Sequence, residues 1–137
     1  RDLVRSRGLG DVYKRQMGRR EDNTVLLKSI DFAVRIVNLY KYLCSSKKDN
    51  VLSKQLLRSG TSIGANLNEA QESISQKEFE SKVYIALKEA RETEYWLELL
   101  LKTDYLNTAQ YDSINADCTE ILKLLVTITK SLRSNKA

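Results

Sequence analysis

The sequence contains no proline and no histidine, and it has only five glycines in 137 residues. Proline and glycine are the residues that most often interrupt helices, so little in this chain forbids long ones. A small β-sandwich would instead require repeated Gly and Pro turn signals. With 42% hydrophobic residues, the length suits one compact domain with a modest core. The composition therefore predicts an all-α protein.

The lack of histidine also narrows the chemistry. A Ser-His-Asp or Cys-His arrangement cannot form, and neither can the Glu-x-x-His pairs of di-metal four-helix bundles. Cys44 and Cys118 are isolated and lack zinc-ligand spacing. A carboxylate pair such as Glu94 and Glu98 is conceivable, but such a pattern on a helix usually belongs to a solvated face or pairs with a neighbour such as Arg91. We expect no enzymatic activity, no metal and no cofactor.

Long apolar runs are missing as well. No stretch of 18 apolar residues and no secretory hydrophobic region is present, so we expect a soluble, cytoplasmic protein with reduced cysteines. Residues 1–16 lack a sustained apolar period and precede the only methionine, Met17. We interpret 1–16 as a non-native or disordered leader, with a native basic arm as the alternative, and 17–137 as the domain. Without that leader the net charge is 18 basic minus 16 acidic residues, or +2, which neither requires nor excludes a nucleic-acid partner.

Apolar residues at spacings of three and four predict four helices. We place the first from about residue 24 to 45, the second from 51 to 73 and the third from 76 to 102. The fourth follows a capping pattern at Asn107 and Gln110 and continues through Leu132. Ser75 and Glu78 form a similar capping pattern before the third helix. An uninterrupted heptad seam in the fourth helix favours bundle packing; it consists of Tyr111, Ile114, Cys118, Ile121, Leu125, Ile128 and Leu132.

Two of the helices carry more apolar residues than a lone bundle needs. The first has an expected core stripe of Leu26, Ile30, Ala33, Val37, Tyr40 and Cys44, and a second stripe of Val25, Phe32, Ile36, Leu39 and Leu43. The third has a core stripe of Phe79, Val83, Ala86, Ala90, Leu97 and Leu101. Apolar residues that the bundle core does not bury would be exposed to water unless another copy covers them, which predicts a homo-oligomer. The expected interface residues are Phe32, Ile36, Leu39, Ile85, Tyr95, Trp96 and Leu99. Alternatively, the first helix is central and is buried on both sides by its own chain.

The second helix contains the stretch LLRSGTSIGANLNEAQES, residues 56–73, which combines helical spacing with small and polar residues. Each glycine inside a helix costs about 1 kcal/mol relative to alanine, so a compensating contact is expected. We predict that Gly60 and Gly64 allow a neighbouring helix to approach closely. Polar bonds across the same contact are expected from Ser59, Ser62 and Asn66. The alternative is a kink or a break, whereas a phosphate-binding loop would need a different spacing.

Five cations are the candidates for nucleic-acid binding, namely Lys54, Arg58, Lys82, Lys88 and Arg91. Tyr84 or Tyr95 would be available for base stacking. Each of the five also has an ordinary reading as a solvated charge. Arg58 has a second alternative, which is pairing with Glu69 or Glu94 inside the bundle.

A family resemblance rests on two segments. In the second helix it is carried by Gln55, Leu56, Arg58, Ser59, Ser62, Ile63, Asn66 and Glu69, and in the third by Glu78, Phe79, Ala86, Leu87, Arg91, Glu92 and Glu94. With these residues the chain resembles the four-helix-bundle family named for proteins encoded in intervening sequences of 23S ribosomal RNA genes. Gly64-Ala65 stands where that family usually has Pro-Ser, and Ala70-Gln71 replaces a Gly-containing end, so we expect a longer and straighter second helix.

The resemblance implies an antiparallel up-and-down four-helix bundle, commonly a homopentamer, with no assigned enzymatic activity. A related member, the accessory protein of diversity-generating retroelements, acts with a reverse transcriptase and nucleic acid. That member is strongly basic, whereas the body of this chain is not. The first hypothesis is therefore a homo-oligomeric scaffold, and the alternative is an RNA- or DNA-binding accessory subunit working with a reverse transcriptase.

Overall fold

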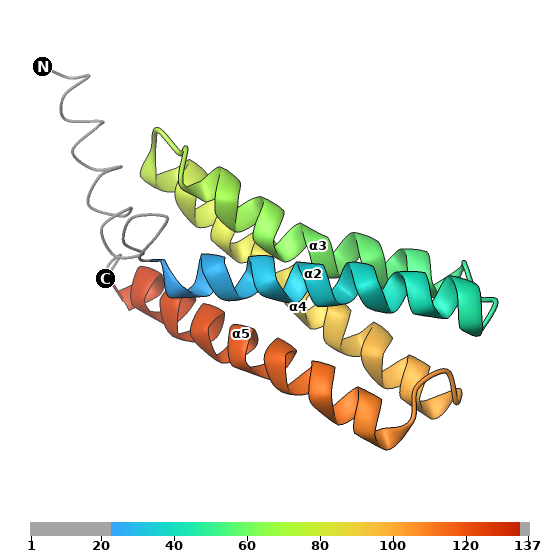
Figure 1. Cartoon of the computed structure of the whole chain (residues 1–137). Helices are drawn as coiled ribbons and strands as arrows, with labels where there is room; N and C mark the ends of the chain where they lie inside the picture. The colour runs from blue at the N-terminus through green and yellow to red at the C-terminus, as the bar shows by residue number, and fades with distance from the viewer. Residues whose placement is uncertain (1–22, 135–137) are drawn as a thin grey trace, which may run out of the picture.

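The computed structural model describes residues 23–134, which form four helices without any strand. They are α2 (Thr24–Ser46), α3 (Leu52–Ala70), α4 (Gln76–Lys102) and α5 (Thr108–Ser134). Each helix runs antiparallel to the one before it, and α5 returns to lie beside α2 (Figure 1). The predicted all-α, antiparallel four-helix bundle is therefore confirmed. The predicted leader, residues 1–16, and the boundary at Met17 lie outside the described residues.

Local side-chain bonds define where the helices begin. Asn23 Oδ1 accepts a hydrogen bond from the backbone N–H of Leu26, and Ser75 Oγ accepts one from that of Glu78. At α5 the bonds are reciprocal, since Asn107 Oδ1 accepts from the Gln110 N–H and Gln110 Oε1 accepts from the Asn107 N–H. These bonds satisfy backbone donors that no preceding helical turn can pair. The two helix starts with a predicted capping pattern, at Ser75 and at Asn107, are thus correct.

The end of α3 differs from the prediction. The helix stops at Ala70, and the N–H groups of Gln71, Glu72 and Ser73 donate to carbonyls three residues earlier. Bonds of this kind tighten the final turn and change the direction in which the following side chains point. Ile74, expected on the core stripe, is consequently 77% exposed. The expectation that the second helix continues to residue 73 or beyond is wrong.

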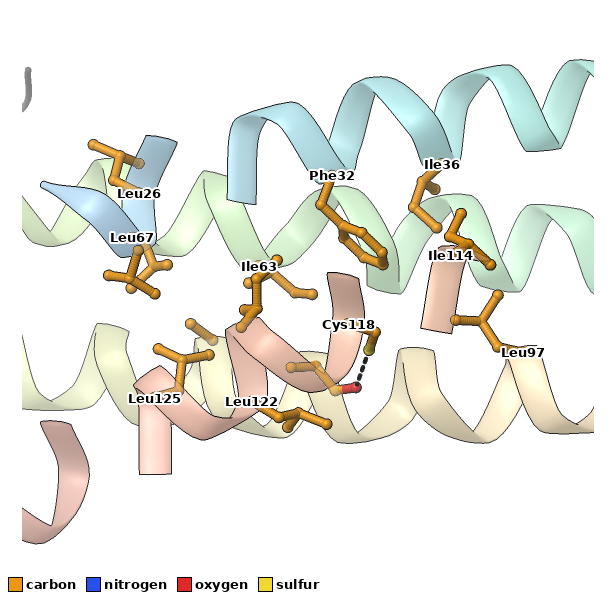
Figure 2. Packing of buried hydrophobic residues seen from close by; sticks show 14 of the residues in the cluster. Leu26, Phe32, Ile36, Ile63, Leu67, Leu97, Ile114, Cys118, Leu122 and Leu125 are labelled. Carbon is orange, nitrogen blue, oxygen red and sulfur yellow. Dashed lines mark hydrogen bonds between the residues drawn. The ribbon is translucent and has the colours of Figure 1, made fainter. Parts of the chain in front are cut away.

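The two stripes of α2 have the opposite roles to those expected. Phe32 and Ile36 are fully buried, and Figure 2 shows both pointing into the interior of the bundle, near Ile114 on α5. The stripe expected in the core is only half-buried for most of its length. The reason is that α2 packs against α3 on one side and α5 on the other, which covers a wide arc of its surface. The assignment of Phe32 and Ile36 to an oligomer interface is therefore wrong, and Leu39 is half-buried against the same core.

The remaining core follows the predicted periods closely. On α5 the buried heptad positions are Ile114, Cys118, Ile121, Leu125 and Leu132. On α4 the buried position near the end of the helix is Leu100 instead of the predicted Leu101. The Cys118 thiol donates to the carbonyl of Ala90, 3.7 Å away, as the dashed line in Figure 2 shows. Among residues 23–134 no helix is long and apolar enough to cross a membrane.

Candidate interaction surfaces

The contact between α2 and α3 depends on the two glycines of α3. A Cβ placed on Gly60 would lie 2.8 Å from Cγ1 and Cγ2 of Ile36, and one on Gly64 would lie 3.1 Å from Oγ of Ser29. A carbon at 2.8 Å overlaps with its neighbour, so the close approach requires the missing side chain. Both glycines lie within one continuous helix. The two glycines therefore let Ile36 and Ser29 of α2 pack directly on α3, and they do not break the helix.

The polar residues of the same stretch have different roles. Ser59 lies against α4, where its Oγ is 3.0 Å from Oγ1 of Thr93, and both residues are fully buried. Ser62 Oγ and Asn66 Nδ2 instead donate to carbonyls of α3 itself, those of Arg58 and Ser62. The expectation that Ser62 and Asn66 bond across the helix contact is wrong, because a serine or asparagine inside a helix can reach the free lone pair of the preceding turn.

Arg58 is held by two carboxylates of α4. Its guanidinium donates to Glu89 at 3.1 Å and also to Glu92. Glu92 in turn accepts a hydrogen bond from the indole N–H of Trp96 at 2.9 Å. The partners suggested from the sequence, Glu69 and Glu94, are wrong. The antiparallel pairing of α3 and α4 decides this, since it places the second turn of α3 beside the middle of α4.

The five candidate nucleic-acid residues do not form one cationic surface. Lys82 pairs with Glu69 on α3 at 3.3 Å, and Arg91 lies 3.8 Å from Glu94. Lys54 and Lys88 are exposed and have no ion pair within residues 23–134. Tyr84, one of the proposed stacking residues, donates to the carbonyl of Thr129 on α5. Three of the five cations are thus partly neutralised by neighbouring carboxylates.

The outer surface of α4 carries exposed apolar residues, which we call the α4 strip and define as Ile85, Tyr95, Trp96 and Leu99. Tyr95 is 56% exposed, and its ring meets that of Trp96 edge-on, with centroids 5.0 Å apart. Trp96 and Leu99 are half-buried. Aromatic surface is therefore accessible beside the Glu92 carboxylate, which is already bonded to Arg58 and Trp96. Such amphipathic surface is typical of protein interfaces.

A second apolar surface, the α2 strip, consists of Leu27, Ile30, Val34 and Val37 on the outer side of α2. Val34 is 56% exposed and Leu27 41%, whereas the other two are half-buried. Their spacing of three, four and three gives one continuous face. The sequence contained this signal, but Ile30 and Val37 had been assigned to the core stripe, so the face was missed.

The seam between α2 and α5 is closed by polar side chains. Arg35 donates to Asp117 at 2.6 Å and to the carbonyl and hydroxyl oxygens of Ser113 at 3.2 and 2.8 Å, and Lys28 pairs with Glu120. The hydrogen bond to Glu120 raises the pKa of Lys28 above its ordinary value. An open groove beside Arg35 is lined by apolar and polar residues of both helices, among them Leu39, Tyr42 and Ile114. No sequence signal links residues about eighty positions apart, so these pairs were not predicted.

Within the part of the chain that the structure describes, no three His, Cys, Asp or Glu side chains lie close enough to hold a metal ion. Burial raises the pKa of the Cys118 thiol to about 12. Exposed apolar side chains lie on the outer faces of α2 and α4.

Taken with the topology, these features define a small up-and-down four-helix bundle with two apolar outer surfaces. The chain belongs to the 23S rRNA-intervening sequence protein family, whose model matches residues 21–127. It is also similar to a protein of unknown function from the S23 ribosomal protein family of Bacteroides thetaiotaomicron, known from a crystal structure. The two are 61% identical with a TM-score of 0.76, over 77% of this chain and 98% of that one. A search among curated proteins gave no match.

The family resemblance is thereby confirmed. The further relation to the retroelement accessory protein is not tested by these similarities and stays a prediction. The solved relative has no stated function, so its likeness supports the fold and the family and leaves the activity to be argued from the surfaces.

Proposed function

We propose that the protein is a non-enzymatic, homo-oligomeric scaffold of the 23S rRNA-intervening sequence type, located in the cytoplasm. The observation that supports this proposal is the pair of apolar strips on the outside of α4 and α2. Tyrosine and tryptophan are favoured anchors of protein interfaces, and exposed apolar residues gathered on one face are often covered by a partner. Self-association would remove both strips from water.

The two strips differ from each other and lie on different helices. A head-to-tail contact, in which the α4 strip of one copy packs on the α2 strip of the next, would bury both at once. Identical head-to-tail contacts close into a ring when the rotation between copies allows it. The family resemblance suggests five copies, although the apolar strips alone require only more than one.

Light scattering on the full chain tests this proposal. Tyr95→Glu and Val34→Glu should each lower the mass towards that of the monomer, because both residues are half or more exposed and their replacement leaves the core intact. In a mixture of the two variants each copy keeps one intact strip, so one head-to-tail contact is possible and a dimer should form. Thr127→Glu, on the exposed side of α5, serves as the control and should keep the native mass.

A native chain that is monomeric at micromolar concentration would contradict the scaffold proposal. If Val34→Glu had no effect while Tyr95→Glu dissociated the assembly, the α4 strips would pair with one another, and the head-to-tail arrangement would be wrong. The alternative function, an RNA- or DNA-binding accessory subunit, receives little support from the residues first assigned to it, since Arg58, Lys82 and Arg91 are paired with carboxylates.

A further inference from the structure

Positive charge is concentrated at one end of the bundle, where α2 ends and α3 begins. Lys41 lies near the end of α2, Lys47 and Lys48 lie in the connecting turn, and Lys54 lies in the first turn of α3; we call these four lysines the basic turn. All four side chains are exposed, and none has an ion pair within residues 23–134. The only acidic residue between them, Asp49, is buried and accepts hydrogen bonds from the backbone N–H groups of Leu52 and Ser53. The exposed charge of this segment is therefore of one sign.

The described chain as a whole is nearly balanced in charge. Residues 23–134 contain 15 basic and 14 acidic side chains, and several cations outside the turn are paired. The neighbouring turn between α4 and α5 adds Asp104 and the paired Lys102–Glu98. The basic turn is thus a local concentration of charge on a nearly neutral bundle, which is the pattern of an electrostatic binding surface.

Two of these lysines stand at positions where helix chemistry favours other residues. Lys48 has a backbone φ of 57°, and the N–H of Asp49 bonds to the carbonyl of Leu43. This geometry is a helix end of the type that usually uses glycine, because a side chain there costs about 1 kcal/mol. Lys54 lies in the first turn of α3, where the positive end of the helix dipole disfavours a cation; the Asp49 carboxylate, bonded to the N–H groups of Leu52 and Ser53, offsets part of that charge. Neither backbone position by itself favours a lysine.

We propose that the basic turn binds the phosphate backbone of a nucleic acid, independently of sequence. Four lysines on flexible stems act as point charges and do not require a fixed, bidentate partner. A nucleic acid offers one charge per nucleotide and can satisfy all four in any register, whereas an acidic protein segment would need carboxylates at matching positions. This surface is separate from the α4 and α2 strips, so it does not rest on self-association.

Fluorescence anisotropy with a labelled 20-nucleotide oligouridine tests the proposal on the full chain. The test variant carries Lys41→Gln, Lys47→Gln, Lys48→Gln and Lys54→Gln. The control variant carries Lys77→Gln, Lys88→Gln, Lys123→Gln and Lys130→Gln, which are also exposed and unpaired in the described part of the chain. Both variants lose four positive charges, so the comparison isolates where the charge lies.

We expect the test variant to bind at least about tenfold more weakly at low salt and the slope of log affinity against log salt to decrease by up to about 3, since each phosphate on a single strand contributes about 0.7. The control variant should keep most of its affinity, and both should keep the native circular dichroism and the native mass. Equal losses in the two variants would mean that only net charge matters, and no detectable binding by the native chain would also overturn the proposal. If polyglutamate displaced the RNA more effectively than unlabelled oligouridine, the surface would serve an acidic protein instead.

Discussion

Gly60 of α3 lies so close to Ile36 of α2 that a single added carbon would come within 2.8 Å of two carbons of the isoleucine side chain. Ile36 is fully buried among residues of the other helices, so it has little room to move away. The close approach of α2 to α3 at this point therefore requires that residue 60 has no side chain.

We predict that Gly60→Ala destabilises the bundle by about 1 to 3 kcal/mol through overpacking, although alanine improves helix propensity by about 1 kcal/mol. Urea unfolding followed by circular dichroism measures the change. Gly64→Ala should cost less, because its nearest neighbour is the hydroxyl of Ser29 at 3.1 Å. Combining Gly60→Ala with Ile36→Ala should cost less than the sum of the two single changes, because the methyl group added at residue 60 enters space that Ile36→Ala vacates.

The matched control is Ala65→Gly, an exposed position on the same helix. It should lose about 1 kcal/mol through helix propensity alone. If Gly60→Ala instead stabilised the protein, the close approach of α2 would not restrict this position.

A second prediction concerns the pair formed by Arg58 and Glu92. Both side chains are partly exposed, so solvent screens their attraction, and we expect a coupling free energy of at most about 1 kcal/mol in a double-mutant cycle of Arg58→Met and Glu92→Gln. The coupling should decrease in 0.5 M salt. Because Glu92 also accepts the hydrogen bond of the only tryptophan, Glu92→Gln should shift the fluorescence emission of Trp96 while Arg58→Met shifts it less.

For comparison, the exposed pair of Lys102 and Glu98, one helical turn apart on α4, should show a coupling of about 0.3 to 0.5 kcal/mol. A coupling at Arg58 no larger than at this pair would show that the two-carboxylate arrangement adds nothing to stability.

The third prediction follows from the buried thiol of Cys118. Burial raises its folded-state pKa to about 12, above the value of about 8.5 that an unfolded cysteine has. Between these values the unfolded chain loses a proton that the folded protein keeps, so stability falls as pH rises from about 9, by up to about 1.4 kcal/mol per pH unit. Below pH 8 the contribution is complete and constant.

Urea melts at pH 8 and pH 10 would measure this decrease, with Cys118→Ala as the comparison. The alanine variant is less stable at both pH values because it leaves a cavity, but it should lack the cysteine part of the pH dependence. In the native chain a thiol reagent should modify the partly exposed Cys44 first and Cys118 only on unfolding. An identical pH dependence in the two proteins would show that Cys118 does not titrate in this way.

The helix starts and the class of fold could be predicted because their causes are local. The bonds at Ser75 and Asn107 involve residues three positions apart, and the heptad of α5 faces the core wherever the neighbouring helices lie. The two glycines of α3 also predicted the close contact with a neighbouring helix, because glycine destabilises a helix interior and a compensating contact was therefore expected. Each of these signals lies within a single helix.

The remaining features depend on which helices become neighbours. The partners of Arg58 follow from the antiparallel offset of α3 against α4, and the burial of Phe32 and Ile36 follows from the arc of α2 that two other helices cover. A periodic pattern shows that a face is apolar but not which neighbour covers it, so the core and surface stripes of α2 were exchanged. The predicted burial of Ile74 was wrong because the last turn of α3 is tightened, and no residue in the sequence indicates that tightening.

The four seams of the bundle are unequal, and this asymmetry gives the molecule a preferred way to open. Close packing of α2 side chains on Gly60 and Gly64 holds α2 to α3. The α2–α5 seam is instead the least extensively packed of the four and depends on solvent-accessible charges around Arg35 and Lys28. Thermal fluctuations should therefore swing α5 away from α2 about its contact with α4, leaving the other three helices as a unit. As the salt concentration rises, backbone amides of α5 should exchange with solvent before those of the other helices. Changes in the position of α5 should therefore cost less free energy than changes in any other helix.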